Sequence, residues 1–185
     1  EFVSEGAPPL PDRRAAALSL DSTLLAELLG RVELRELLDA DVIARAELEL
    51  QRLLPDRKAK DLEGVADLLR LLGPLTSDEV AARSTADPAP WLDELVRAKR
   101  ALSVSFAGRE WWTAIEDAAR LRDGLGVPLP IGVPAAFIEP VDDPLADLIS
   151  RYARTHGPFT VTDAAARFGL GSAVARDVLQ RLAQG

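Results

Sequence analysis

The sequence contains no cysteine, no methionine and a single histidine, His156, among its 185 residues. Without cysteine the chain has no disulfides, no thiolate nucleophile and no cysteine-ligated zinc. A single histidine argues against imidazole-based catalytic triads and against metal sites built from several histidines. These absences remove the commonest catalytic and metal centres from consideration.

Basic residues are outnumbered by acidic ones, 22 against 30, so the formal net charge is −8. A chain with this charge is not a general polyanion binder, and any contact with nucleic acid must come from a local basic patch. No apolar run approaches the roughly 20 residues that a membrane span needs, and no signal peptide opens the chain. We therefore expect no membrane partner and a cytoplasmic location.

The first 57 residues predict a linker followed by a small helical subdomain. The chain does not begin with methionine, and the proline-rich stretch 7–11 is typical of a linker, which predicts a piece of a longer protein. Apolar residues at helical spacing then predict helices over 18–30, 32–38 and 42–54. This subdomain is expected to be a connector or, alternatively, a partner-binding surface.

Residues 58–117, the first module, have the element order of a winged-helix domain. A capping-box sequence that begins at Thr76 predicts the second of three helices. Alternation of apolar and polar residues then predicts two strands joined by a tight turn, which form the wing of such a domain. The expected elements are helices over 62–72, 77–83 and from Pro88 onward, and strands over 101–106 and 110–115.

Residues 144–185, the second module, repeat the helical part of the first. Gly73-Pro74-Leu75-Thr76 corresponds to Gly157-Pro158-Phe159-Thr160, and at the same offset Ala81-Ala82-Arg83 corresponds to Ala165-Ala166-Arg167. The alternative is coincidence in a chain rich in alanine and arginine. The repeat predicts a helix-turn-helix with helices over 161–167 and 172–183.

The second module stops where a wing strand would be expected. Its last helix is expected to be held to the module by Val174, Val178 and Leu182. Without a wing, Val178, Leu179 and Leu182 should lack cover over part of their surface. Between the modules, residues 118–143 are expected to form a proline-rich but ordered connector. The predicted fold class is mainly α, with tandem winged-helix or helix-turn-helix modules, one short β-hairpin wing and an N-terminal helical segment over residues 1–57.

Acidic and aromatic clusters have structural interpretations that outweigh catalytic ones. The chain has no Gly-Lys-Ser or Gly-Lys-Thr phosphate loop, and Asp78-Glu79 begins a capped helix rather than ending a buried strand. The pairs Glu116-Asp117 and Asp142-Asp143 are expected to serve as turn and capping residues. Of Trp111-Trp112, one should face the core, although a base-stacking platform is the alternative. We expect no catalytic residue and no metal site.

Local charge ranks the second module above the first as a DNA-binding element. From residue 145 onward arginine outnumbers aspartate, whereas the third helix of the first module begins with Asp87, Asp93 and Glu94, which would repel phosphates. The candidate DNA-binding residues are Arg167, Ser172, Arg176, Gln180 and Arg181 in the second module and Arg97, Arg100 and Arg109 in the first.

Several runs resemble the bacterial large helicase-related (Lhr) ATP-dependent DNA helicases. They include residues 13–18, 24–30, 34–39, 67–75 and 115–118. Two runs are the most specific, residues 132–137 and residues 143–160. The second run ends in Arg-Tyr-Ala-Arg-Thr-His-Gly-Pro-Phe-Thr, residues 151–160. The resemblance extends from about Gly6 to the end of the chain.

The resemblance implies a position within a much larger polypeptide. A superfamily 2 helicase core of the DEAD/DEAH-box type, which uses ATP and Mg, precedes this region in the family, and an extension of tandem winged-helix modules follows. That extension is associated with oligomerisation and resembles winged-helix DNA glycosylases of the type that unhooks interstrand crosslinks. The helicase motifs have no counterpart here, so no catalytic residue carries over.

Two functions therefore compete. One is a non-catalytic, DNA-binding accessory of a helicase that takes part in DNA repair. The other is a scaffold that packs against other domains of the helicase or joins copies of it into a homo-oligomer.

Overall fold

The computed structural model describes residues 40–185, of which residues 47–185 form one compact unit. The helices expected over 18–30 and 32–38 lie outside the described residues. Helix α3 (Ala40–Leu50) ends at Leu50, not at residue 54 as expected. The backbone of Arg52 turns left-handed, with φ of 58°, and the amides of Arg52 and Leu53 bond back to the carbonyls of Glu49 and Leu48. This turn closes the helix.

The first module has the predicted winged-helix order of elements. A short 3-10 turn (Pro55–Arg57) precedes it, and a second (Ile115–Asp117) follows the hairpin. The third helix is the one that carries Asp93 and Glu94 on its exposed side. The elements are α4 (Leu62–Leu72), α5 (Ser77–Ala82), α6 (Ala89–Arg97), β1 (Ala101–Phe106) and β2 (Arg109–Ala114).

The part of the chain that follows the hairpin is helical, and its last three helices lie in residues 144–185, where a second module is predicted. The short 3-10 turn Ala135–Phe137 is the only regular element that the structure describes between residues 126 and 143. The helices are α7 (Ala118–Leu125), α8 (Pro144–Thr155), α9 (Val161–Phe168) and α10 (Ser172–Gln184).

The same capping box begins the second helix of each module. The hydroxyl of Thr76 accepts the amide of Glu79 at 3.3 Å, and the Glu79 carboxylate accepts the amide of Thr76 at 2.9 Å. Thr160 and Asp163 make the corresponding pair at 3.1 and 2.9 Å. Each box satisfies amides that the first helical turn leaves unpaired. The repeat seen in the sequence therefore corresponds to the same local geometry in both modules.

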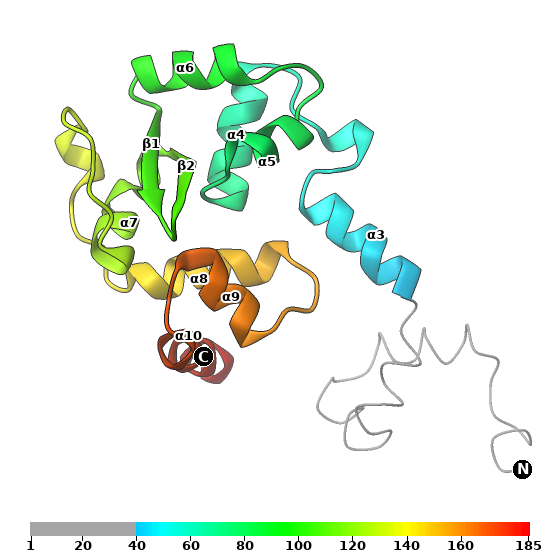
Figure 1. Ribbon diagram of the computed structural model, residues 1–185, viewed down its shortest axis with the longest axis vertical. Helices are drawn as coiled ribbons and strands as arrows, with labels where there is room; N and C mark the ends of the chain where they lie inside the picture. Colours follow the sequence, from blue (N-terminus) through cyan, green and yellow to red (C-terminus); the bar gives the residue numbers. More distant parts are fainter. Residues whose placement is uncertain (1–39) are drawn as a thin grey trace, which may run out of the picture. The chain divides into compact units, whose positions relative to one another are not determined.

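The β-hairpin has two buried faces. In its antiparallel register Ala101 lies opposite Ala114, and Val104 lies opposite Trp111. Since neighbouring side chains on a strand point to opposite faces, Ala101 and Ala114 reach one core while Val104 and Trp111 reach the other. The hairpin lies between α6 on one side and α7 with α8 on the other (Figure 1).

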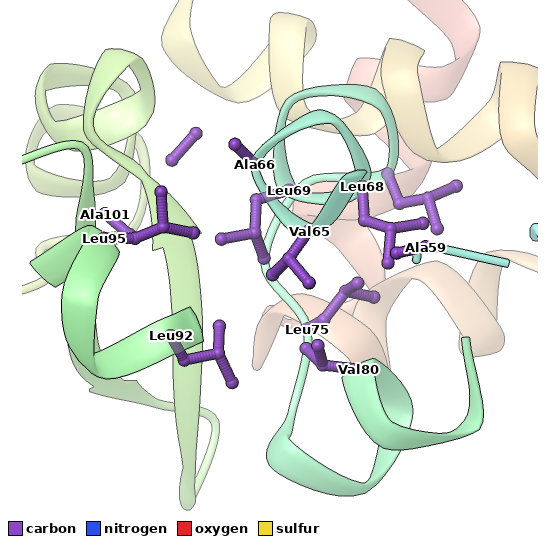
Figure 2. Packing of buried hydrophobic residues seen from close by; sticks show 12 residues of the cluster. Ala59, Val65, Ala66, Leu68, Leu69, Leu75, Val80, Leu92, Leu95 and Ala101 are labelled. Carbon is purple, nitrogen blue, oxygen red and sulfur yellow. The ribbon is translucent and has the colours of Figure 1, made fainter. Parts of the chain in front are cut away.

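The first core joins α4 to the other elements of the first module. Val65 and Leu69 of α4 point toward Leu92 and Leu95 of α6, and Val80 of α5 closes the cluster (Figure 2). All five side chains are buried. Apolar positions at helical spacing on α4 and α6 produce this packing, as the sequence predicts.

The second core includes residues that the sequence assigned to a connector. Ala118 and Leu121 of α7, followed by Val127, pack with α8 and with the second face of the hairpin. In α10, Val178 is only 1% exposed, so the expected lack of cover does not apply to it. Val174 is 47% exposed and does not hold the helix as expected. Ala175, one residue further along the helix, points inward instead.

Candidate nucleic-acid interface

The wing of the first module is packed against the second module. The Trp111 side chain is 1% exposed, stacks on Phe106 with ring centroids 4.6 Å apart, and donates its indole N–H to the Phe106 carbonyl at 2.9 Å. At the wing tip, Gly169 approaches Ala107 so closely that an added Cβ would lie 3.0 Å from it. The Trp111 face of the wing is therefore not free to enter a DNA groove, whereas Arg109 and Glu110 at the start of β2 are exposed. Trp112, on the opposite face, is half-buried.

Arg167 crosses from α9 to the first module. Its guanidinium forms an ion pair with Glu79 at 2.6 Å, donates to the Pro74 carbonyl at 3.0 Å, and lies 4.6 Å from the Trp111 ring centroid. Burial acts to raise the pKa of Glu79, but hydrogen bonds from Arg167 and the Thr76 amide hold that pKa below its usual value. This candidate DNA-binding arginine therefore makes its contacts with other residues of the protein.

A second buried ion pair reinforces the packing of the modules. Asp117, only 2% exposed, lies 2.9 Å from the guanidinium of Arg151, which also donates to the Arg70 carbonyl. Burial raises the pKa of Asp117, although the positive charge of Arg151 opposes the shift. The left-handed Gly73 lets Arg151 approach, because a Cβ there would meet the guanidinium at 3.0 Å. Asp117 was expected to be a simple turn residue.

A polar cluster of Gln51, Arg83 and His156 joins the loop after α3 to both modules. Arg83 donates to the Gln51 side chain at 2.9 Å, and the Gln51 amide donates to the Thr155 carbonyl. The His156 ring stacks on Tyr152, and its Nδ1 lies 2.8 Å from the Tyr152 carbonyl. Because a carbonyl only accepts, Nδ1 carries the proton.

The position of His156 gives the protein a pH-dependent stability. Burial lowers the pKa of His156, although the hydrogen bond to the Tyr152 carbonyl opposes the shift. The positive charges of Arg167 and Arg83 lower this pKa further, despite Glu47. Below pH 6.5 the unfolded chain thus binds more protons than the folded one, and the free energy of unfolding should fall as pH decreases. The slope is at most about 1.4 kcal/mol per pH unit for one proton.

Urea titrations between pH 7.5 and 5.5 test this expectation, with His156→Asn as the comparison because asparagine keeps a donor for the Tyr152 carbonyl. The variant should lose the pH dependence in this range. An equally steep fall in both proteins would assign the effect to other groups.

Two more candidate DNA-binding residues are held by carboxylates. Arg100 makes two hydrogen bonds to Glu63, at 2.7 and 2.8 Å. Arg181 pairs with Asp143 at 2.7 Å and with Asp177 at 3.4 Å. These contacts are exposed and break at little cost, but they reduce the charge available to a phosphate.

The remaining candidates are exposed. Ser172, Arg176 and Gln180 follow one another at four-residue spacing and share a stripe on α10. Arg109 is exposed at the start of β2, with its guanidinium 5.5 Å from the Trp111 ring centroid. Arg97 is exposed on α6. Among the described residues neither Arg176 nor Arg97 forms an ion pair.

Sequence reasoning missed one basic surface. A groove of about 760 Å³ lies between residues 52–60 and α4, and its basic lining residues are Arg52, Arg57, Lys58, Lys60 and Arg70. The short basic run over residues 52–60 was the signal that could have revealed it.

The structure describes no group of three or more acidic or histidine side chains placed to hold a metal ion within residues 40–185. No helix in that range is long and apolar enough to cross a membrane.

Comparison with known families agrees with the fold. The model of the winged-helix domain of large helicase-related proteins matches residues 36–140. The chain belongs to the large helicase-related (Lhr) family. The match includes the first module, α7 and the segment through the 3-10 turn at Ala135–Phe137. The mainly helical fold with one two-stranded hairpin is the winged-helix fold expected from the sequence.

Two curated Lhr proteins align with almost the whole chain. The Lhr helicase/probable uracil glycosylase of Mycolicibacterium smegmatis is 64% identical over 183 residues, and the Lhr helicase/uracil glycosylase of Escherichia coli is 46% identical over 185. Each alignment covers 98% of this chain and 12% of the relative. The chain thus spans a small part of the length of these Lhr relatives.

Proposed function

We propose that this chain is a non-catalytic DNA-binding region of a large ATP-dependent helicase that takes part in DNA repair. The names of the two relatives, both helicases, support the parent activity. In this proposal ATP and Mg bind to a helicase core elsewhere in the parent, which acts in the cytoplasm. Residues 58–117 and 144–185 are the two modules, and DNA meets the second.

The observation that carries this proposal is the exposed stripe on α10. This helix occupies the place of the recognition helix in a helix-turn-helix, the element that enters the major groove in such proteins. Arg176 and its neighbours Ser172 and Gln180 offer one charged and two polar side chains, and the adjacent carboxylate, Asp177, pairs with Arg181. Buried Ala175 and Val178 hold the helix to its module from behind.

Charge reversal on α10 tests the proposal. Arg176→Glu should weaken binding of a labelled DNA duplex at low salt, because one phosphate contact is replaced by repulsion. The slope of log affinity against log salt should also decrease by about 1 for the lost contact. Fluorescence anisotropy at several salt concentrations measures both quantities.

The matched control is Arg97→Glu on α6, another exposed arginine without an ion-pair partner in the described part of the chain. Asp93 and Glu94 already repel phosphate there, so this variant should bind DNA nearly as well as the unmodified protein. Equal losses in the two variants would remove the basis for choosing α10.

A second function, as a rigid scaffold, is supported by the hairpin that both cores share. Trp111 and the Arg167–Glu79 pair join the modules into one body, as an element that spaces other domains or subunits of the parent would require. Failure of the unmodified chain to bind DNA, together with a mass in solution that rises with concentration, would favour this function.

A further inference from the structure

The basic groove beside α4 concentrates positive charge in a chain that is acidic overall. Its lining contains five basic residues and only two acidic ones, Asp61 and Asp67. Asp67 pairs with Arg70 at 2.9 Å, and Asp61 accepts the amide of Gly64 as the N-cap of α4. Both carboxylates are therefore engaged by the protein itself.

Three cations of the groove are left for a ligand. Arg57 is paired with Glu49 at 2.7 Å, whereas Arg52, Lys58 and Lys60 form no ion pair among the described residues. Lys60 is exposed, and Lys58 and Arg52 are half-buried.

Arg52 has a left-handed backbone, with φ of 58° at the end of α3, a position that glycine usually fills because it lacks a Cβ. Lys99 has the same conformation after α6, with φ of 57°, so the backbone marks the end of a helix in both places. At Arg52 it fixes where the side chain leaves the main chain beside the groove. Arg52 is one of the three unpaired cations of the groove.

Close packing forms the floor of the groove. Gly64 of α4 lies against Ala59, where an added Cβ would come within 3.1 Å of the Ala59 Cα and Cβ. The backbone of Ala59 is fixed by hydrogen bonds to Arg83 and Thr85, both 2.8 Å long. Lys58 and Lys60 therefore project from a segment held in place on both sides.

We propose that this groove, formed by Arg52, Lys58 and Lys60 beside α4, binds the sugar-phosphate backbone of a DNA strand. An open groove lined by unpaired cations suits a chain of phosphates, because each cation can neutralise one phosphate along the strand. The contacts carry no base-reading group, so binding is independent of sequence and strongly dependent on salt. The groove is a second contact besides α10, and it rests on the proposed DNA-binding function.

The experiment uses the full chain and a fluorescein-labelled 20-nucleotide DNA of mixed sequence, single-stranded and as a duplex, in anisotropy titrations at several salt concentrations. Lys58→Glu with Lys60→Glu should weaken binding at least about tenfold at low salt and reduce the salt slope by about 2, one for each lost phosphate contact. The matched control, Lys99→Glu with Arg154→Glu, changes the net charge equally on exposed residues of the turn after α6 and of α8, and should weaken binding less than about twofold.

Arg52→Gly separates binding from folding. Glycine relieves the left-handed strain, so the Tm should stay the same or rise, while DNA affinity falls. A purely structural role for Arg52 would leave DNA affinity unchanged in this variant, and that result would overturn the assignment of Arg52. Circular dichroism confirms that the lysine variants remain folded.

The outcomes distinguish the groove from the α10 proposal. Loss of binding in the lysine variant with little change in Arg176→Glu supports the groove and rejects α10. Any of three results would overturn the proposal that the groove binds DNA. They are the opposite pattern, equal losses in the groove variant and its matched control, and no DNA binding by the unmodified chain.

Discussion

Replacement of Trp111 by alanine is expected to lower the free energy of unfolding by about 3–5 kcal/mol, as large-to-small changes at buried aromatic positions do. Trp111 is 1% exposed, and its ring contacts Phe106 and the Arg167 guanidinium. The substitution leaves a cavity between the hairpin and the second module. Urea denaturation followed by far-ultraviolet circular dichroism measures the loss.

Trp112→Ala is the matched control, because it removes the same side chain from the neighbouring position and the opposite face. Trp112 is half-buried and donates to the Ser77 hydroxyl at 2.9 Å, so its loss should cost only about 1–2 kcal/mol. A larger loss at Trp112 than at Trp111 would show that the contact between the modules contributes less than the structure indicates.

Arg167→Ala is expected to destabilise the chain by about 2–3 kcal/mol, because it leaves Glu79 partly buried without its cation. The value is below that of a fully buried pair, since the Arg167 and Glu79 side chains are 19% and 25% exposed. The pKa of Glu79 should rise in the variant, because burial then acts without the opposing arginine. Denaturation and NMR titration of the Glu79 carboxyl carbon measure the two effects.

Arg154→Ala serves as the control for Arg167. Arg154 is exposed on α8 and donates to the Ser150 hydroxyl at 3.0 Å, and it has no ion-pair partner in the described part of the chain. Its loss should change stability by less than about 0.5 kcal/mol, as at most surface positions. Equal stability of the Arg167→Ala and Arg154→Ala variants would contradict the expected contribution of the Arg167–Glu79 pair.

Local chemistry explains why most of the elements could be predicted. The capping boxes at Thr76 and Thr160, the period-two pattern of β1 and the apolar spacing of α4 all act between residues close in sequence. The end of α3 was predicted wrongly because Pro55 suggested a later stop, whereas the left-handed turn at Arg52 closes the helix first. A left-handed arginine has no sequence signature.

The candidate site was less predictable because its residues meet across long sequence separations. Arg167 was ranked for DNA by its charge alone, but its partner Glu79 lies 88 residues earlier in the chain. The equivalent residue of the first module, Arg83, bonds instead to Gln51. The repeat therefore predicted the shared capping boxes, but Arg83 follows α5 whereas Arg167 lies within α9, and the repeat could not predict which neighbours each arginine would contact.

Each strand of the hairpin supplies alternate residues to two different cores. The hairpin therefore cannot gain or lose a residue without disturbing both cores. A single residue inserted between Phe106 and Trp111 would exchange the two faces of β2, placing Glu110 where Trp111 belongs and Trp111 where Trp112 belongs. Both cores would lose their fit at once. Variation in length among related chains should therefore gather in the segment between Val127 and Asp143, and the turn at Ala107-Gly108 should keep its two residues.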